Sequence, residues 1–93
     1  MEKIIIFGLG DISQIAHFYL SQNNDYEVVA FTVDREYVTQ NEFENLPVIA
    51  FEDVEATYSN TEFKMFIPLS YTKVNKFRQQ KFSEAKAKGY DFI

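Results

Sequence analysis

The chain begins with an unbroken apolar run. Residues 3–7 read Lys-Ile-Ile-Ile-Phe, and the run stops at Gly8. Because its apolar residues are consecutive and do not alternate with polar ones, the run predicts a strand buried on both faces, as in parallel sheets. After Gly10 the spacing changes to intervals of three and four residues, which predicts one apolar helix face. The residues on that face are Ile12, Ile15, Ala16, Tyr19 and Leu20.

Strands and helices continue to alternate along the chain. Residues 35–46 have weak periodicity and are expected to form a loop with one helical turn. Residues 47–50 form a short strand that we expect at a sheet edge, because Pro47 cannot donate to a neighbouring strand. The other expected elements are strands at 27–33, 64–69 and from 90 onward, and helices within 51–58 and at 72–88. This order predicts an α/β domain of three layers, with a mostly parallel sheet of roughly four to five strands.

The composition limits the classes of protein that the chain can represent. Its 93 residues suffice for one domain, and ten Phe and six Tyr supply an apolar core. The absence of cysteine excludes disulfide frameworks, zinc ribbons and thiol nucleophiles, and the single histidine, His17, excludes a multi-histidine metal site. No metal site is therefore expected.

The charge and hydropathy point to a cytoplasmic domain. The formal net charge of −5 disfavours non-specific binding to nucleic acid or to anionic membranes. No apolar run approaches the roughly 18 residues of a membrane-spanning helix, and the N-terminal residues do not resemble a signal peptide. We therefore expect neither a nucleic-acid partner nor membrane insertion.

The turn after the first strand carries a glycine pair. Gly8, Leu9, Gly10 and Asp11 join the strand to the expected helix. A strand, a G-x-G turn and a helix together form the phosphate-binding element of Rossmann-like folds, with Ser13 at the third, small position. The alternative is a turn that needs only a positive φ angle or close packing. Asp11 favours this alternative, because its charge stands near the expected phosphate.

Two further segments are expected at the same edge of the sheet. Asp34 ends the second strand, where an acid commonly accepts hydrogen bonds from a ribose; the alternative is a solvated acid paired with Arg35. Ser70, Tyr71 and Thr72 follow the strand at 64–69 and could hydrogen-bond or stack on a base or sugar. Thr72 is equally explained as a cap for the following helix.

The long helix carries basic residues within its apolar face. Arg78 and Lys81 lie in the same arc as the apolar residues Val74, Phe77, Phe82 and Ala85. Snorkelling over the core explains such residues in most proteins, and contact with an anionic ligand is the alternative. His17 is expected to point away from the apolar face of its helix. No second base, nucleophile or acid pair is spaced to work with it, so the sequence predicts no catalytic residue.

Taken in order, these motifs resemble a known domain. It is the N-terminal Rossmann-like domain of hexapeptide-repeat sugar acyltransferases, of the sialic-acid O-acetyltransferase and bacillosamine N-acetyltransferase type. The resemblance covers residues 1–93, and its sequence departs from the family at Asp11 and Ile12, where the family usually has Gly-His. The segments that carry it are residues 3–10, the strand ending at Asp34, and residues 46–48, 66–69 and 88–90.

The resemblance implies a substrate-binding domain that is not catalytic alone. In that family the domain holds a sugar or a sugar nucleotide of the UDP-sugar type for polysaccharide biosynthesis. A left-handed β-helix is expected after residue 93, carrying the catalytic histidine, the acetyl-CoA site and the contacts of a homo-oligomer. No cofactor is expected in residues 1–93 themselves.

Two other functions stay open at the level of sequence. One is a protein-interaction domain that has lost its ligand, which Asp11 and Ile12 favour. The other is a fragment of a dinucleotide-binding oxidoreductase. This second function is disfavoured because 93 residues supply little more than one mononucleotide-binding half.

Overall fold

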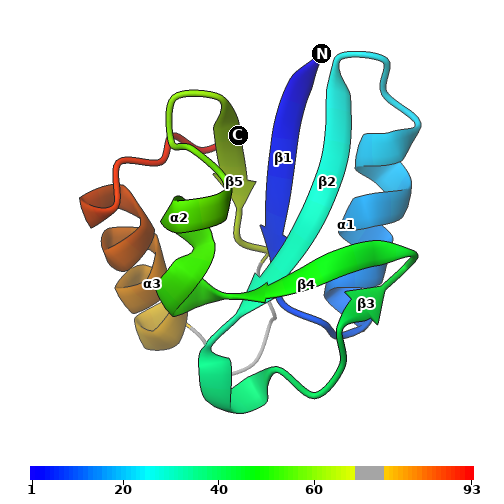
Figure 1. Ribbon diagram of the computed structural model, residues 1–93. Coiled ribbons are helices and arrows are strands. Elements are labelled where there is room, and N and C mark those ends of the chain that lie inside the picture. The colour runs from blue at the N-terminus through cyan, green and yellow to red at the C-terminus, as the bar shows by residue number, and fades with distance from the viewer. Residues whose placement is uncertain (69–74) are drawn as a thin grey trace.

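A five-stranded sheet with strand order β3-β4-β2-β1-β5 forms the centre of the protein. The computed structural model describes residues 1–68 and 75–93, with the backbone only for 75–78 (Figure 1). Strands β1, β2, β4 and β5 run parallel, and β3 pairs with β4 in the antiparallel direction. Their bounds are Glu2–Phe7 (β1), Tyr26–Val33 (β2), Glu42–Phe43 (β3), Leu46–Ala50 (β4) and Phe63–Phe66 (β5).

Helices cover both faces of the sheet. Helix α1 (Asp11–Ser21) lies on one face, and α2 (Val54–Thr57) and α3 (Asn75–Ala87) lie on the other (Figure 1). Two 3-10 turns, η1 (Arg35–Tyr37) and η2 (Phe51–Asp53), follow β2 and β4. The three-layer α/β fold with a mostly parallel sheet is therefore confirmed.

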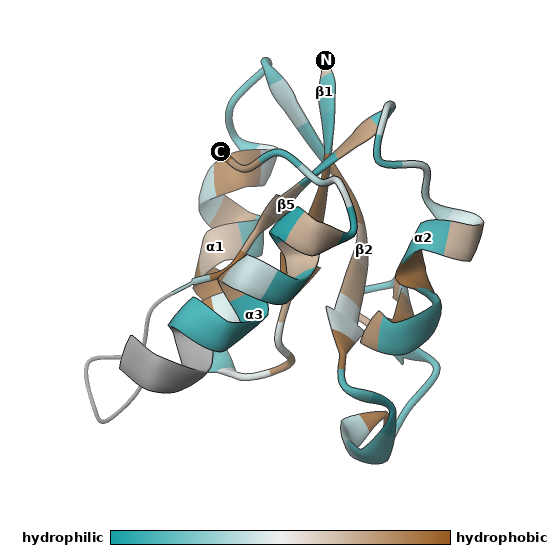
Figure 2. Ribbon diagram, turned by 90° about the vertical axis from the view of Figure 1, so that its left-hand side faces the viewer, coloured by the Kyte–Doolittle hydropathy of each residue, from teal (hydrophilic) through white to brown (hydrophobic). Residues whose placement is uncertain are grey.

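The core has two apolar layers, one on each face of β1. Ile4 and Ile6 pack with Ala16 on the side of α1, whereas Ile5 and Phe7 pack on the side of α2 and α3. The exposure of these four strand residues is at most 8%. Figure 2 shows the hydrophobic colour along the central strands and the hydrophilic colour on much of α3. The unbroken apolar run thus forms a strand buried on both faces, as its pattern predicts.

Helix α1 packs through a face that matches only part of the one that its periodicity predicts: Ala16 is buried and Leu20 packs against the core as expected, but Ile15 and Tyr19 do not. Ser13 and Ala16 are its buried residues, whereas Ile15 is 55% and Tyr19 66% exposed. Small side chains allow the helix to approach the sheet closely, so they occupy the line of contact. Ile15 and Tyr19 are displaced toward the solvent.

This rotation of α1 also changes the environment of His17. Its side chain was expected to point away from the core, but it is half-buried. Its ring centroid lies 5.7 Å from that of Phe31 on β2. The expectation for His17 is therefore wrong, and the residue has a packing role.

Strand β4 is not at the sheet edge. It lies between β2 and β3, and the two-residue strand β3 falls in the segment expected to be a loop. A tight turn at Glu44 and Asn45, with φ angles of 52° and 63°, connects β3 to β4. Pro47 is tolerated because the parallel pairing with β2 begins only at Val48. The turn was missed because it contains no glycine.

The last strands are shorter than expected. Strand β5 ends at Phe66, two residues before Pro68. The strand expected from residue 90 is reduced to a single parallel bridge between Phe92 and Met65. Residues 69 and 72–74, which the sequence assigned to a strand and a helix, lie outside the described residues.

Gly89 ends α3 and directs the chain back to the core. Its φ angle is 95°, and a Cβ atom there would lie 2.4 Å from Nδ2 of Asn60. That amide donates a hydrogen bond to the carbonyl of Lys88 at 2.8 Å. The next residue, Tyr90, is 1% exposed, and its hydroxyl donates to the carbonyl of Tyr58. Glycine is therefore required here by both backbone conformation and packing.

Buried and exposed apolar residues should respond differently to truncation of their side chains. Ile6→Ala removes a residue that is 0% exposed, so unfolding should require about 2–5 kcal/mol less free energy. Ile15→Ala, at a 55% exposed position, should cost under about 1 kcal/mol. Urea unfolding measures both values. Equal losses would contradict the packing of α1 described above.

Alkaline unfolding should depend on Tyr90. Burial and the nearby charge of Glu55 raise the pKa of Tyr90 to about 12 from the ordinary value of 10.0. The unfolded chain therefore loses this proton first, so the contribution to stability is complete below about pH 10 and is lost as the pH rises through about 12. Between about pH 8 and 11.5, the melting temperature of the wild type should fall more steeply with pH than that of Tyr90→Phe. Parallel declines would contradict this assignment.

Candidate functional site

The carboxyl ends of β1 and β2 meet at one edge of the sheet. Phe7 at the end of β1 pairs with Thr32 on β2, and the N–H of Gly8 donates to the carbonyl of Thr32 at 2.9 Å. Asp34 follows β2 directly. The glycine turn and Asp34 therefore emerge from neighbouring strands, in the region where open parallel sheets bind ligands.

Gly8 is required by the fold itself. Its φ angle is 116°, a conformation that residues with a Cβ atom rarely adopt. A Cβ atom there would also lie 2.6 Å from Oγ of Ser13. Ser13 is 3% exposed, and its Oγ donates a long hydrogen bond of 3.4 Å to the carbonyl of Phe7. Close packing of α1 on β1 explains this glycine without a ligand.

Gly10 differs from Gly8 because the fold does not require a glycine there. Its φ and ψ angles are −91° and −170°, which any residue adopts. A Cβ atom at this position would meet none of the described atoms within 4 Å. Asp11 is exposed, and Leu9 packs against the core on the α1 side. The start of α1 is thus open to a ligand, next to helical N–H groups that have no partner within the helix.

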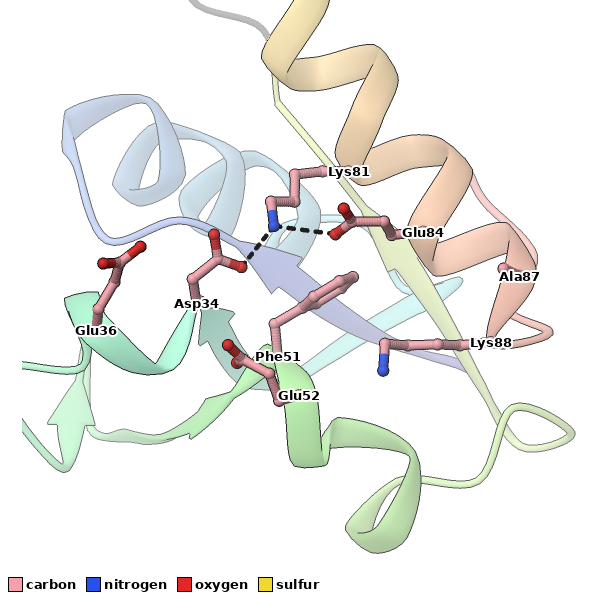
Figure 3. A pocket seen from close by; sticks show the side chains of 8 residues that line it. All are labelled: Asp34, Glu36, Phe51, Glu52, Lys81, Glu84, Ala87 and Lys88. Atoms are coloured by element: carbon pink, nitrogen blue, oxygen red, sulfur yellow. Dashed lines mark hydrogen bonds and ion pairs between the residues drawn. The ribbon is translucent and has the colours of Figure 1, made fainter.

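Asp34 pairs with Lys81, which lies on helix α3 (Figure 3). Nζ of Lys81 on α3 lies 2.6 Å from Oδ1 of Asp34 and 3.0 Å from Oε1 of Glu84. The exposed fractions of the Lys81 and Asp34 side chains are 8% and 16%. Sequence reasoning singled out Lys81 as a basic residue in an apolar face, but it did not find this pair.

The pair keeps Lys81 charged despite its burial. Burial alone would lower the pKa of the Lys81 ammonium, but hydrogen bonds to Asp34 and Glu84 outweigh it and raise the pKa above the ordinary value. The hydrogen bond from Lys81 correspondingly lowers the pKa of Glu84. The cluster is therefore a charged one at neutral pH.

Arg35 does not pair with Asp34, contrary to the alternative drawn from the sequence. Its Nη2 lies 2.6 Å from Oδ2 of Asp53, and its backbone N–H donates to Oε1 of Glu52 at 2.9 Å. The Arg35 side chain is 61% exposed. It joins η1 to η2.

An open cavity of about 500 Å³ lies between the ends of β2 and β4 and helix α3 (Figure 3). Phe51 supplies an aromatic wall, and the four acidic residues outnumber the two basic ones. Such a lining accepts hydrogen bonds from hydroxyl or amino groups and disfavours additional negative charge. The lining residues are Asp34, Glu36, Phe51, Glu52, Lys81, Glu84, Ala87 and Lys88.

A second concavity, of about 340 Å³, is apolar and lies between α1 and the end of β5. It contains the residues that periodicity assigned to the buried face of α1, including Ile15 and Tyr19. Ile15 and Tyr19 therefore line a surface groove, whereas Ala16 and Leu20 also pack in or against the core. Its residues are Ile12, Ile15, Ala16, Tyr19, Leu20, Phe66 and Pro68.

Several expected features lie outside the part that the structure describes. They are Ser70, Tyr71, Thr72 and the side chain of Arg78. Within residues 1–68 and 75–93, no group of three or more His, Cys, Asp or Glu residues is arranged to hold a metal ion. In the same ranges, every helix is too short or too polar to cross a bilayer.

Comparison with known proteins identifies similar structures but no sequence family. No protein family and no curated protein matches the chain. The acetyltransferase domain of PglB from Neisseria gonorrhoeae FA1090 matches 97% of this chain with 26% identity and a TM-score of 0.71. Its complex with acetyl coenzyme A matches 96% with 25% identity and a TM-score of 0.69. These matches support an acyltransferase-related domain.

A third structure shares the fold alone. RSP, a Rex-family repressor, matches 97% of this chain with 13% identity and a TM-score of 0.66. The chain spans 42% of the length of this repressor and 42% and 40% of the two PglB chains. Both matched proteins thus contain much more chain than these 93 residues.

The two glycines of the turn predict opposite results on substitution. Gly8→Ala should lower the free energy of unfolding by about 1–3 kcal/mol, because the positive φ angle is strained for alanine and Ser13 must move. Gly10→Ala should change it by less than about 1 kcal/mol, because the conformation and space both suit a side chain. Chemical denaturation measures both. A large loss at Gly10 would contradict the open turn.

Proposed function

We propose that this chain is the substrate-binding domain of a sugar O- or N-acyltransferase and is not catalytic alone. It holds a sugar or a UDP-type sugar nucleotide at the carboxyl edge of its sheet. The diphosphate lies at the start of α1, and Asp34 accepts a hydrogen bond from a ribose hydroxyl. Ser70, Tyr71 and Thr72 follow β5 in sequence and are proposed to complete the site.

The open space at Gly10 is the observation that carries this proposal. Neither conformation nor packing requires a glycine at Gly10. Its lack of a side chain leaves the backbone accessible at the start of α1, where free helical N–H groups attract an anion. Asp34 follows the neighbouring strand and supplies an acceptor for hydroxyl groups. Asp11 is exposed, so solvent and salt screen its carboxylate and limit its repulsion of a phosphate.

The acyl-transfer step is proposed to belong to another part of a longer protein. The likeness to the PglB acetyltransferase domain and its complex with acetyl coenzyme A supports acetyl-CoA as the acyl donor. We propose that a β-helix domain follows residue 93, provides the catalytic histidine and joins copies into an oligomer. Residues 1–93 then recognise the acceptor sugar.

Titration with UDP tests the proposal. Isothermal calorimetry should detect saturable binding of UDP to the chain, and Gly10→Val should weaken it by at least about tenfold, because the side chain occupies the approach to the backbone. Thermal unfolding of Gly10→Val should match that of the wild type. NADH, titrated in parallel, should bind more weakly, since its second nucleotide finds no matching half in the chain.

Three outcomes would contradict the proposal. One is the absence of heat and of a melting shift at millimolar UDP. Another is equal affinity of the wild type and Gly10→Val for UDP, which would favour a protein-interaction domain that has lost its ligand. Tighter binding of NADH than of UDP would favour a dinucleotide-binding protein.

A further inference from the structure

Lys81 is a buried cation on α3. Its exposure is 6%, and its Nζ lies 5.9 Å from the ring centroid of Phe7 and 5.2 Å from that of Phe51. An ammonium group in such surroundings is costly unless it is paired and hydrogen-bonded. A lysine that only covered the core with its stem would instead keep its ammonium group in water. Snorkelling, the expectation from the sequence, therefore does not describe Lys81.

The two carboxylates that pair with Lys81 differ in their surroundings. Glu84 lies one turn further along α3, and its side chain is 40% exposed. Asp34 lies 47 residues away on the other side of the site, and its side chain is 16% exposed. The link to Asp34 is also the shorter, at 2.6 Å against 3.0 Å. Lys81 thus fixes the end of β2 to α3 through Asp34.

This link engages one oxygen of Asp34 and leaves the other without a donor among the described residues. Oδ1 accepts from Lys81, and Oδ2 accepts no hydrogen bond from any described residue. A carboxylate held by one oxygen cannot turn freely, so the position of the second oxygen is also fixed. The neighbouring Arg35 does not compete, because its guanidinium pairs with Asp53.

The surroundings argue against a direct role for Lys81 in holding a phosphate. The cavity beside it is lined by four acidic and two basic residues, which disfavours a further anion. Its ammonium group already donates to two carboxylates. Two of its three N–H donors are therefore engaged by carboxylates.

We infer that Lys81 is a positioning residue, which holds Asp34 so that a single oxygen, Oδ2, accepts a hydrogen bond from a single hydroxyl of the ligand. The inference rests on the proposed function, and it adds a specificity rule to it. A carboxylate with two free oxygens can grip both hydroxyls of a ribose. Because the Lys81 ammonium partly neutralises and orients Oδ1, Oδ2 is the stronger remaining acceptor, so the site favours the one hydroxyl that faces Oδ2 over its neighbour.

Binding of UDP, 2′-deoxy-UDP and 3′-deoxy-UDP, measured by calorimetry, tests this inference. For the wild type, one deoxy analogue should bind about tenfold or more weakly than UDP, and the other should bind about equally. Lys81→Met should reduce that difference to under about threefold, because Asp34 loses its orientation. Lys81→Arg should retain it, since a guanidinium can still hold Oδ1.

Matched variants separate positioning from a general effect on folding. Glu84→Gln leaves the link between Lys81 and Asp34 in place, so it should keep the difference between the analogues even if the melting temperature falls. Asp34→Asn removes the charged acceptor and should abolish the difference. These two variants and Lys81→Arg also decide the question if Lys81→Met does not fold.

The inference is overturned if the wild type loses affinity equally for both analogues or for neither. It is also overturned if Lys81→Met or Asp34→Asn keeps the difference, or if Lys81→Arg or Glu84→Gln loses it. Failure of the wild type to bind UDP at all would instead remove the proposed function, and the inference with it. Normal binding of UDP with an unaltered preference in Lys81→Met would reject the inference alone.

Discussion

The burial of β1 on both faces is the constraint on which the rest of the structure depends. Residues Ile4–Phe7 are almost completely excluded from water, and they can be so only if helices cover the sheet on each side. Strands β2 and β5 flank β1 and satisfy its backbone hydrogen bonds. The carboxyl end of β1, where the glycine turn begins, is thereby fixed between those of β2 and β5.

The two glycines of the turn differ in whether the fold requires them. Gly8 serves the fold, because its positive φ angle and its contact with Ser13 bring α1 close to β1. Neither the backbone angles nor the packing require a glycine at Gly10, which leaves the start of the helix open. A motif that reads as a single signature in the sequence thus consists of one structural glycine and one that a bound ligand would explain.

The buried ion pair between Lys81 and Asp34 lies at the same edge of the sheet. Lys81 lies on α3 and Asp34 follows β2, so their contact joins α3 to the carboxyl end of β2. Breaking it would leave a charge in an apolar setting, which costs more than the pair itself contributes. The proposed recognition of a hydroxyl group and the stability of this region therefore depend on the same contact.

Local sequence determined the fold class and most of the elements of this protein. The unbroken run before Gly8, the helical spacing after it and the stop at Gly89 each reflect a steric or solvation rule that acts within a few residues. The same rules located Asp34 at the end of a strand, beside the turn that carries Gly10.

Tertiary structure alone decided which faces pack and which charges pair. Ser13 and Ala16 contact the sheet in place of Ile15 and Tyr19, because helix-to-sheet distance rather than hydrophobicity sets the rotation of α1. Asp34 pairs with Lys81 and not with its neighbour Arg35, because a contact across 47 residues depends on how α3 lies over the sheet. Periodicity records which residues are apolar, but not how close two elements approach.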